Sequence, residues 1–110
     1  IHVLGDAIQV APQMPKSGHM ANQHGKVAAA AVLALLAGQP VNAEPVVINT
    51  CYSFIDDREA VHITSVHRYE ATQKTFLPVP GATGLSAAKS AREGDYGFAW
   101  AHAIWQDMLG

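Results

Sequence analysis

The chain has 110 residues, of which 49% are hydrophobic, and its net charge at pH 7 is −2. A chain of this size and composition is expected to fold as one globular domain. It contains seven lysine and arginine residues, too few for the basic surface that binds nucleic acid. Its longest apolar run, residues 27–37, is about half of the roughly 20 residues that a membrane-spanning helix needs. Nucleic-acid binding and a membrane span are therefore not expected.

The N-terminal third predicts a strand, a loop and a long helix. Residues 1–5 are almost wholly apolar and predict a short buried strand, and residues 7–15 contain two prolines and predict a loop. Ser17 is a suitable N-cap for a helix that runs to about Ala37, where Gly38 ends it.

Two features of this helix predict its surroundings. Gly25 costs about 1 kcal/mol relative to alanine, which suggests a close contact at that position. Residues 27–37 are apolar on every face, a pattern typical of a helix that is buried all round. Since 110 residues offer little material to wrap it, we expect further domains or a second copy to cover one side.

The middle of the chain predicts a small antiparallel sheet. Residues 46–55, 61–69 and 74–79 are strand-like segments joined by short polar connections, as in a meander. Residues 80–84 predict a flexible connector.

The C-terminal segment predicts a second helix. Ser90 and Glu93 have the spacing of a capping box at its start. One helix face carries Phe98, Ala101, Trp105 and Met108. The aromatic residues of this segment, Trp100 among them, are expected in the core, and the alternative is that Trp100 or Trp105 lines a cofactor or a partner surface. The fold class is therefore α+β: a long buried helix, a three-stranded antiparallel sheet and a C-terminal aromatic helix.

The segment that ends at Gly5-Asp6 resembles the last flavin-contacting segment of a flavoprotein. Gly5 allows the backbone to approach a ligand closely, and Asp6 can accept hydrogen bonds from ribityl hydroxyl groups. Taken alone, Asp6 is more often a residue that caps a turn. The helix that begins shortly after this segment favours the flavin interpretation.

The start of that helix is a candidate anion site. The N–H groups near Gly18, His19 and Met20, just after the cap Ser17, combine with the helix dipole to attract negative charge. A reduced flavin carries negative charge on its pyrimidine edge. A helix end stabilises charge by about 0.3–2 kcal/mol, and about 1.4 kcal/mol corresponds to roughly 30 mV for a two-electron couple. Lys16 either adds positive charge at the same edge or is a solvated loop lysine.

The only cysteine, Cys51, has two interpretations. A lone cysteine is usually a small buried hydrophobic residue, yet an odd cysteine can also form half of a bridge to another polypeptide segment. If Cys51 faces a flavin, its thiolate is the reactive species. The spacing of the six histidines argues against a metal site, because His62 and His67 lie on opposite faces of a strand and a single cysteine completes no tetrahedral zinc set.

The chain contains no strand–GxGxxG–helix pattern for the ADP half of FAD. We therefore expect it to be the C-terminal piece of a larger redox enzyme, which carries half of a flavin site. Residues 1–15 would end the FAD-binding domain, and residues 16–110 would form a C-terminal domain that contacts flavin and forms an interface.

Several sequence blocks occur in the order found in one family. They are Leu4-Gly5-Asp6-Ala7, Met14-Pro15-Lys16-Ser17-Gly18-His19-Met20-Ala21-Asn22, Asn49-Thr50-Cys51-Tyr52-Ser53, and Glu93-Gly94-Asp95-Tyr96 with Trp100-Ala101 and Ile104-Trp105. Together they resemble the C-terminal part of the flavoprotein subunit of flavocytochrome c sulfide dehydrogenase, over nearly the whole chain. The Gly-Asp element is common to many flavoproteins, whereas the second and third blocks are much more specific.

The resemblance implies a fold like the C-terminal domain of glutathione-reductase-like flavoproteins. It implies an FAD enzyme that oxidises sulfide at a flavin-adjacent cystine and passes electrons to a c-type cytochrome subunit, usually in the bacterial periplasm. Cys51 matches the C-terminal cysteine of that cystine, and Asp6 matches the residue that holds the ribityl chain. Residues 16–20 match the loop and helix start at the isoalloxazine ring.

The other cysteine, the ADP-binding motif and the remaining N-terminal flavoprotein domains lie outside this sequence, so activity of the chain alone is not expected. Two alternatives stay open. The chain is a non-catalytic module for self-association or cytochrome docking, or it belongs to a related enzyme of the sulfide:quinone oxidoreductase type.

Overall fold

The computed structural model describes all residues, 1–110, and confirms an α+β fold. Seven elements follow one another along the chain. They are a 3₁₀ turn, η1 (Gly5–Ala7), then α1 (Gly18–Leu36), β1 (Val46–Phe54), β2 (Ala60–Glu70), β3 (Thr75–Pro78), β4 (Gly84–Leu85) and α2 (Ala91–Leu109). No helix combines the length and the hydropathy needed to cross a bilayer.

β2 is the central strand of an antiparallel sheet. It pairs with β1 on one side, and on the other side with β3 at one end and β4 at the other. The register places Cys51 opposite Ile63 and Val47 opposite His67. Since side chains alternate between faces along a strand, Cys51 and His67 share one face of the sheet and His62 lies on the other. The opposite orientation predicted for the two histidines is confirmed.

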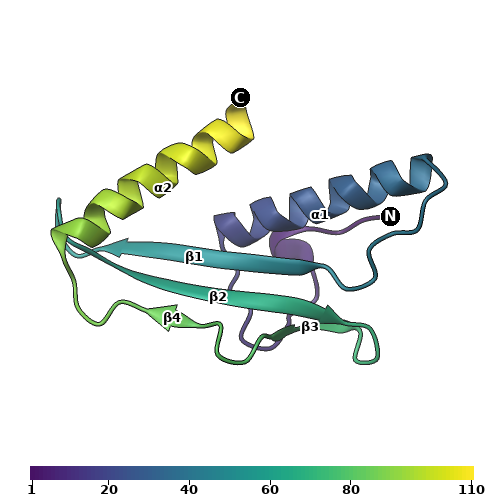
Figure 1. The fold of residues 1–110 in the computed structure, drawn as a ribbon, viewed down its shortest axis with the longest axis horizontal. Helices are drawn as coiled ribbons and strands as arrows, with labels where there is room; N and C mark the ends of the chain where they lie inside the picture. The colour runs from purple at the N-terminus through teal and green to yellow at the C-terminus, as the bar shows by residue number, and fades with distance from the viewer.

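α2 begins at the C-terminal end of β1, whereas α1 begins beside the middle of β1 and runs toward the first residues of that strand, as Figure 1 shows. The start of α1 lies at the free edge of β1, where His19 accepts the backbone N–H of Thr50. The C-terminal end of α2 reaches back to α1, where Asp107 contacts Asn22 and Lys26 at 3.0 and 2.9 Å. The free strand edge and the two helices are thereby joined by polar contacts.

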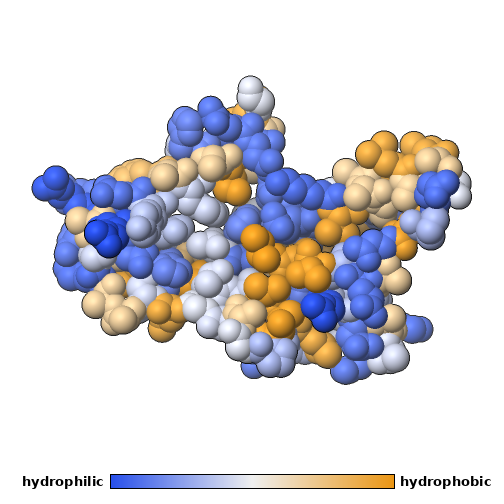
Figure 2. Space-filling model, viewed as in Figure 1, coloured by the Kyte–Doolittle hydropathy of each residue, from blue (hydrophilic) through white to orange (hydrophobic).

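α1 has the predicted cap but a different environment from the predicted one. Ser17 accepts the N–H of Met20, which confirms the N-cap. The second half of the helix is not buried within this chain: Leu36 is 81% exposed, and Figure 2 shows apolar surface over that end of the helix. The close contact predicted at Gly25 is wrong, because no atom lies within 4 Å of the position of a Cβ there.

Three further predictions need correction. Residues 1–4 form no strand and are exposed, because no strand in the structure pairs with them. The end of the predicted connector is ordered as β4, which pairs Gly84 with Thr64. The aromatic face of α2 is not core, since Phe98, Trp105 and Met108 are exposed, whereas Trp100 packs against the rings of His19 and Tyr52.

Two glycines of α2, Gly94 and Gly97, let the N-terminal part of the helix pack closely against the β1–β2 hairpin. A Cβ at Gly94 would lie 1.9 Å from the carbonyl oxygen of Arg58, and one at Gly97 would lie 3.1 Å from the ring of Phe54. Ser90 accepts the N–H of Glu93 as the capping box predicts, but the Glu93 carboxylate contacts His62 instead of the backbone at Ser90. Close backbone approach and this ion pair fix α2 on the sheet.

We predict that Gly94→Ala lowers the free energy of unfolding, because overpacking costs about 1–3 kcal/mol and the gain in helix propensity is about 1 kcal/mol. Gly25→Ala is the matched control. Its Cβ meets open space, so it should raise the free energy of unfolding by about 1 kcal/mol. Urea denaturation measures both, and equal effects of the two substitutions would contradict the close seat of α2.

Candidate functional site

The Gly5–Ala7 turn is held against α1. Gly5 has a φ of +66°, a conformation that glycine adopts without strain, and its N–H donates to Nδ1 of His24 at 3.2 Å. The Lys16 ammonium donates to the backbone carbonyl of Asp6 at 2.8 Å. The turn is thus attached to the helix on one side, and on the other to the loop that joins the turn to the helix.

A cavity of about 190 Å³ lies between this turn and the start of α1. Five of the seven predicted cofactor-binding residues line it: Gly5, Asp6, Lys16, Ser17 and Met20. The Asp6 side chain is exposed and makes no hydrogen bond within the chain, so its carboxylate is free to accept hydrogen bonds from a ligand. The structure therefore brings the predicted polar groups to one hollow.

The first turn of α1 offers fewer free donors than the sequence suggests. Ser17 already accepts the N–H of Met20 at 3.1 Å, so the N–H groups of Gly18 and His19 remain for a ligand. The side chains of Met20 and His19 are buried, and the imidazole of His19 faces Trp100 with 5.5 Å between ring centres. At this end of the helix, the backbone and not the side chains can bind an anion.

Cys51 is a free, half-buried thiol on β1. The Asn49 side-chain N–H points at its sulfur over 3.2 Å, and the Asn49 carbonyl oxygen accepts the hydroxyl of Ser17. Asn49 is only 1% exposed. A single buried amide therefore connects the predicted reactive sulfur with the cap of the predicted flavin-binding helix.

A second hollow, of about 240 Å³, lies beside Cys51. Its walls carry no charged side chain, and they come from β1, β2 and the loops that flank α1 and β3. They are Gln13, Pro15, Asn49, Cys51, Ile63, Ser65, His67, Pro78 and Thr83. Because Pro15 also lines the first cavity, the loop that carries Lys16 separates the sulfur from the Asp6 turn.

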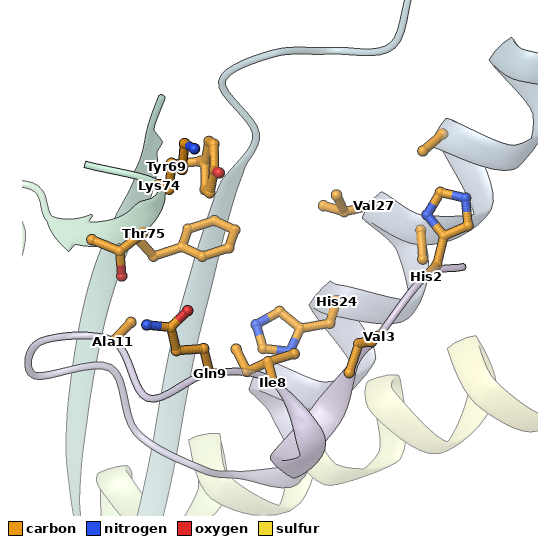
Figure 3. Close-up of a pocket in the computed structure, with 13 residues that line it drawn as sticks. His2, Val3, Ile8, Gln9, Ala11, His24, Val27, Tyr69, Lys74 and Thr75 are labelled. Atoms are coloured by element: carbon orange, nitrogen blue, oxygen red, sulfur yellow. The ribbon is translucent and has the colours of Figure 1, made fainter. Parts of the chain in front are cut away.

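A third cavity, also of about 240 Å³, is mainly apolar and lies between α1, the N-terminal segment and the β2–β3 turn. Figure 3 shows the His24 ring between Ile8 and Val27 in this cavity. The Nε2 atom of His24 has no hydrogen-bond partner. Since Nδ1 is occupied by Gly5, the two nitrogens of this ring have different environments.

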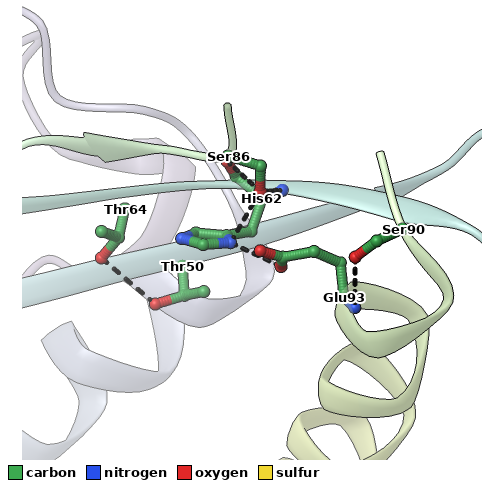
Figure 4. A network of polar contacts seen from close by, with 6 residues as sticks. All are labelled: Thr50, His62, Thr64, Ser86, Ser90 and Glu93. Carbon is green, nitrogen blue, oxygen red and sulfur yellow. Dashed lines mark hydrogen bonds and ion pairs between the residues drawn. The ribbon is translucent and has the colours of Figure 1, made fainter. Parts of the chain in front are cut away.

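A polar network that the sequence does not predict lies on the other face of the sheet, as Figure 4 shows. Nδ1 of His62 lies 2.7 Å from Oε2 of Glu93 and 2.9 Å from Oγ of Ser86. A serine–histidine–acid triad uses both ring nitrogens, one for the acid and one for the serine. Here both partners contact the same nitrogen, so the network anchors α2 and does not form a triad.

Burial governs the charge of three histidines. It lowers the pKa of His19, of His24 and of His67. For His19 the backbone contact with Thr50 opposes this effect, and the positive charge of Lys26 adds to it. His67 is completely buried, and the backbone of Gln13 beside its ring only partly offsets the effect of burial on its pKa. These rings are therefore held neutral in the folded chain.

The structure therefore combines an α+β fold with a hollow between a Gly-Asp turn and a helix start. The family model for the flavin-binding domain of flavocytochrome c sulphide dehydrogenase matches residues 43–109, which is more than half of the chain. The chain belongs to this family. The matched segment contains Cys51 and the whole sheet, whereas residues 5–20 with the Asp6 turn precede it.

Membership of a flavin-binding family makes FAD the cofactor of this domain. The residues present fit such a group. Asp6 offers an acceptor without a partner, and Gly5 allows close approach of the backbone. Gly18 and His19 do not line the cavity, but their N–H groups at the helix start have no acceptor in the chain. This donor set suits ribityl hydroxyl groups on one side and an anionic ring edge on the other.

We predict that the free energy of unfolding falls as the pH is lowered below about 6.5. The unfolded chain then takes up protons that the three buried histidines refuse in the folded state, so stability rises with pH across this window. Each histidine contributes a slope of up to about 1.4 kcal/mol per pH unit.

Urea denaturation between pH 7.5 and pH 5, in buffers of about equal ionic strength, measures this slope. His19→Asn and His24→Asn should each reduce it, because asparagine does not titrate. A free energy of unfolding that stays constant over the window would contradict the burial of these rings.

Proposed function

We propose that this chain supplies one half of the flavin site of a sulfide dehydrogenase. In this proposal a further polypeptide segment supplies the ADP-binding motif and a second cysteine, and a c-type cytochrome subunit accepts the electrons in the periplasm. The observation that carries the proposal is the Ser17–Asn49–Cys51 connection. It joins the only thiol of a flavin-binding family member to the start of the helix beside the Asp6 hollow.

In the proposal, each wall of the site has one task. The Asp6 carboxylate accepts hydrogen bonds from the ribityl chain, and the N–H groups of Gly18 and His19 stabilise negative charge on the ring. Lys16 adds positive charge nearby and holds the turn through the Asp6 carbonyl. Bound FAD supplies a two-electron acceptor that can release electrons singly.

Cys51 carries the sulfur chemistry in this proposal. It forms a disulfide with the second cysteine, and hydrosulfide attacks that disulfide. One new S–S bond forms as the old one breaks, so one cysteine becomes a persulfide and the other leaves as a thiolate. The uncharged hollow beside Cys51 gives the incoming sulfur room, and the Asn49 N–H is placed to hydrogen-bond the sulfur of Cys51.

Cys51→Ser in the complete enzyme should abolish sulfide-dependent reduction of the cytochrome, because serine forms no disulfide. The visible flavin absorption should persist, since Cys51 lies outside the cavity that holds Asp6. Ser53→Ala, two residues along the same strand, is the control and should keep the activity. Retained sulfide oxidation in Cys51→Ser would refute the assignment of Cys51.

A second candidate function rests on the exposed apolar faces of the two helices. Leu33 and Leu36 on α1, with Trp105 and Met108 on α2, are largely exposed. Such a surface is typical of an interface. It favours a non-catalytic module that associates with itself or docks a cytochrome. An acceptor of the quinone type is a further variant of the enzymatic proposal.

Binding of FAD by the purified chain separates these two functions. The enzymatic proposal expects FAD added to the chain to bind at the half-site, and Asp6→Ala to raise its Kd by about tenfold, the value for a charged hydrogen bond of about 1.4 kcal/mol. Fluorescence titration measures the Kd, and sedimentation measures self-association. A chain that binds no FAD and only self-associates would support the module instead.

A further inference from the structure

Two histidines of α1 make the same unusual contact. Each accepts a backbone N–H through Nδ1, and each does so for a segment distant in the sequence. His24 accepts from Gly5 at 3.2 Å, and His19 accepts from Thr50 at 2.9 Å. Both rings are more than nine-tenths buried. Two histidines of α1 therefore bind the backbone of two separate segments, the Gly5–Ala7 turn and β1.

The contact of His24 fixes the Asp6 turn. Gly5 directly precedes Asp6, and a Cβ built on Gly5 would lie 3.7 Å from Cβ of Ala21, in ordinary contact distance. Without the imidazole, the half-buried Gly5 N–H would have no partner in the chain. The position of Asp6 relative to the helix start thus depends on this bond.

The contact of His19 fixes the strand at the sulfur. Thr50 directly precedes Cys51, and its N–H points outward from the free edge of β1, where no further strand pairs with it. His19 is held in turn by packing against Trp100. The imidazole therefore replaces a strand partner at the residue before the thiol.

We propose that His19 and His24 are positioning residues that set the Cys51 wall and the Asp6 wall at a fixed spacing on α1. This inference rests on the proposed function, since the spacing matters only if Cys51 and Asp6 serve one flavin. Neither ring touches the reacting atoms, and each acts through the backbone of the residue before the functional one.

The proposal requires a neutral ring in both places, because a protonated Nδ1 cannot accept an N–H. Burial lowers the pKa of both rings and so favours the neutral form at pH 7.5. The titratable groups around His24 are those that line its two cavities: His2, Asp6, Lys16, Tyr69 and Lys74. For His19 the charged neighbour is Lys26, which is paired with Asp107 of α2.

Asparagine is the decisive replacement, because its carbonyl can take the place of Nδ1 as an acceptor and does not titrate. His24→Leu should raise the Kd for FAD about tenfold at pH 7.5 and leave the reaction of the Cys51 thiol with an aromatic disulfide unchanged. His19→Leu should change the rate at which the Cys51 thiol reacts with the aromatic disulfide. Its Kd for FAD should stay within about twofold of wild type. His102→Leu, an exposed histidine on α2, is the matched control.

In the wild type, the Kd for FAD should rise as the pH falls from 7.5 to 5. His24→Asn should bind FAD as the wild type does at pH 7.5 and lose this pH dependence. Amide hydrogen exchange gives the direct readout: the Gly5 N–H should exchange faster in His24→Leu, the Thr50 N–H faster in His19→Leu, and both slowly in the asparagine variants.

Two results would overturn the proposal: equal effects of both leucine variants on both readouts, or asparagine variants as impaired as the leucine ones. If the leucine variants do not fold, the asparagine variants and the pH profile of the wild type decide. Failure of the positioning role leaves Cys51→Ser inactive towards sulfide, whereas failure of the proposed function leaves Cys51→Ser active, so the two are distinguishable.

Discussion

The candidate site depends on the hydrogen bonds of one buried residue, Asn49. Its carbonyl oxygen accepts the hydroxyl of Ser17, its N–H points at Cys51, and its backbone carbonyl accepts the hydroxyl of Thr64. A buried amide that loses one partner costs about 1–3 kcal/mol. The helix cap, the central strand and the sulfur thus all contact one residue, and none of them can shift without leaving a polar atom of Asn49 unsatisfied.

Local signals in the sequence were sufficient for most of the fold. Ser17 and Ser90 marked the starts of both helices, because a cap is a contact within three residues. The predictions that failed concerned contacts between distant segments. Residues 1–5 read as a strand, but a strand exists only where another strand pairs with it, and the two-residue β4 is defined solely by its pairing with β2.

In the candidate site, too, local features could be predicted from the sequence, whereas contacts between distant segments could not. Five residues that line the Asp6 hollow could be predicted because they all lie within the first 20 residues of the chain. The connection from Ser17 to Asn49 spans 32 residues, and the contacts of His19 and His24 span 31 and 19. No spacing rule relates a helix histidine to a backbone N–H so far away in the sequence. The exposed aromatic face of α2 was missed because amphipathic spacing does not say which face meets the rest of the chain.

α2 is held in place near both of its ends. Its first turns rest on the sheet through Gly94, and Asp107 near its far end is fastened to Asn22 and Lys26. Trp105 and Met108 take part in neither support and face outward. Substitutions at these two positions leave both supports in place, so the outer face of α2 can change without loss of the contacts that hold the helix against the sheet and α1.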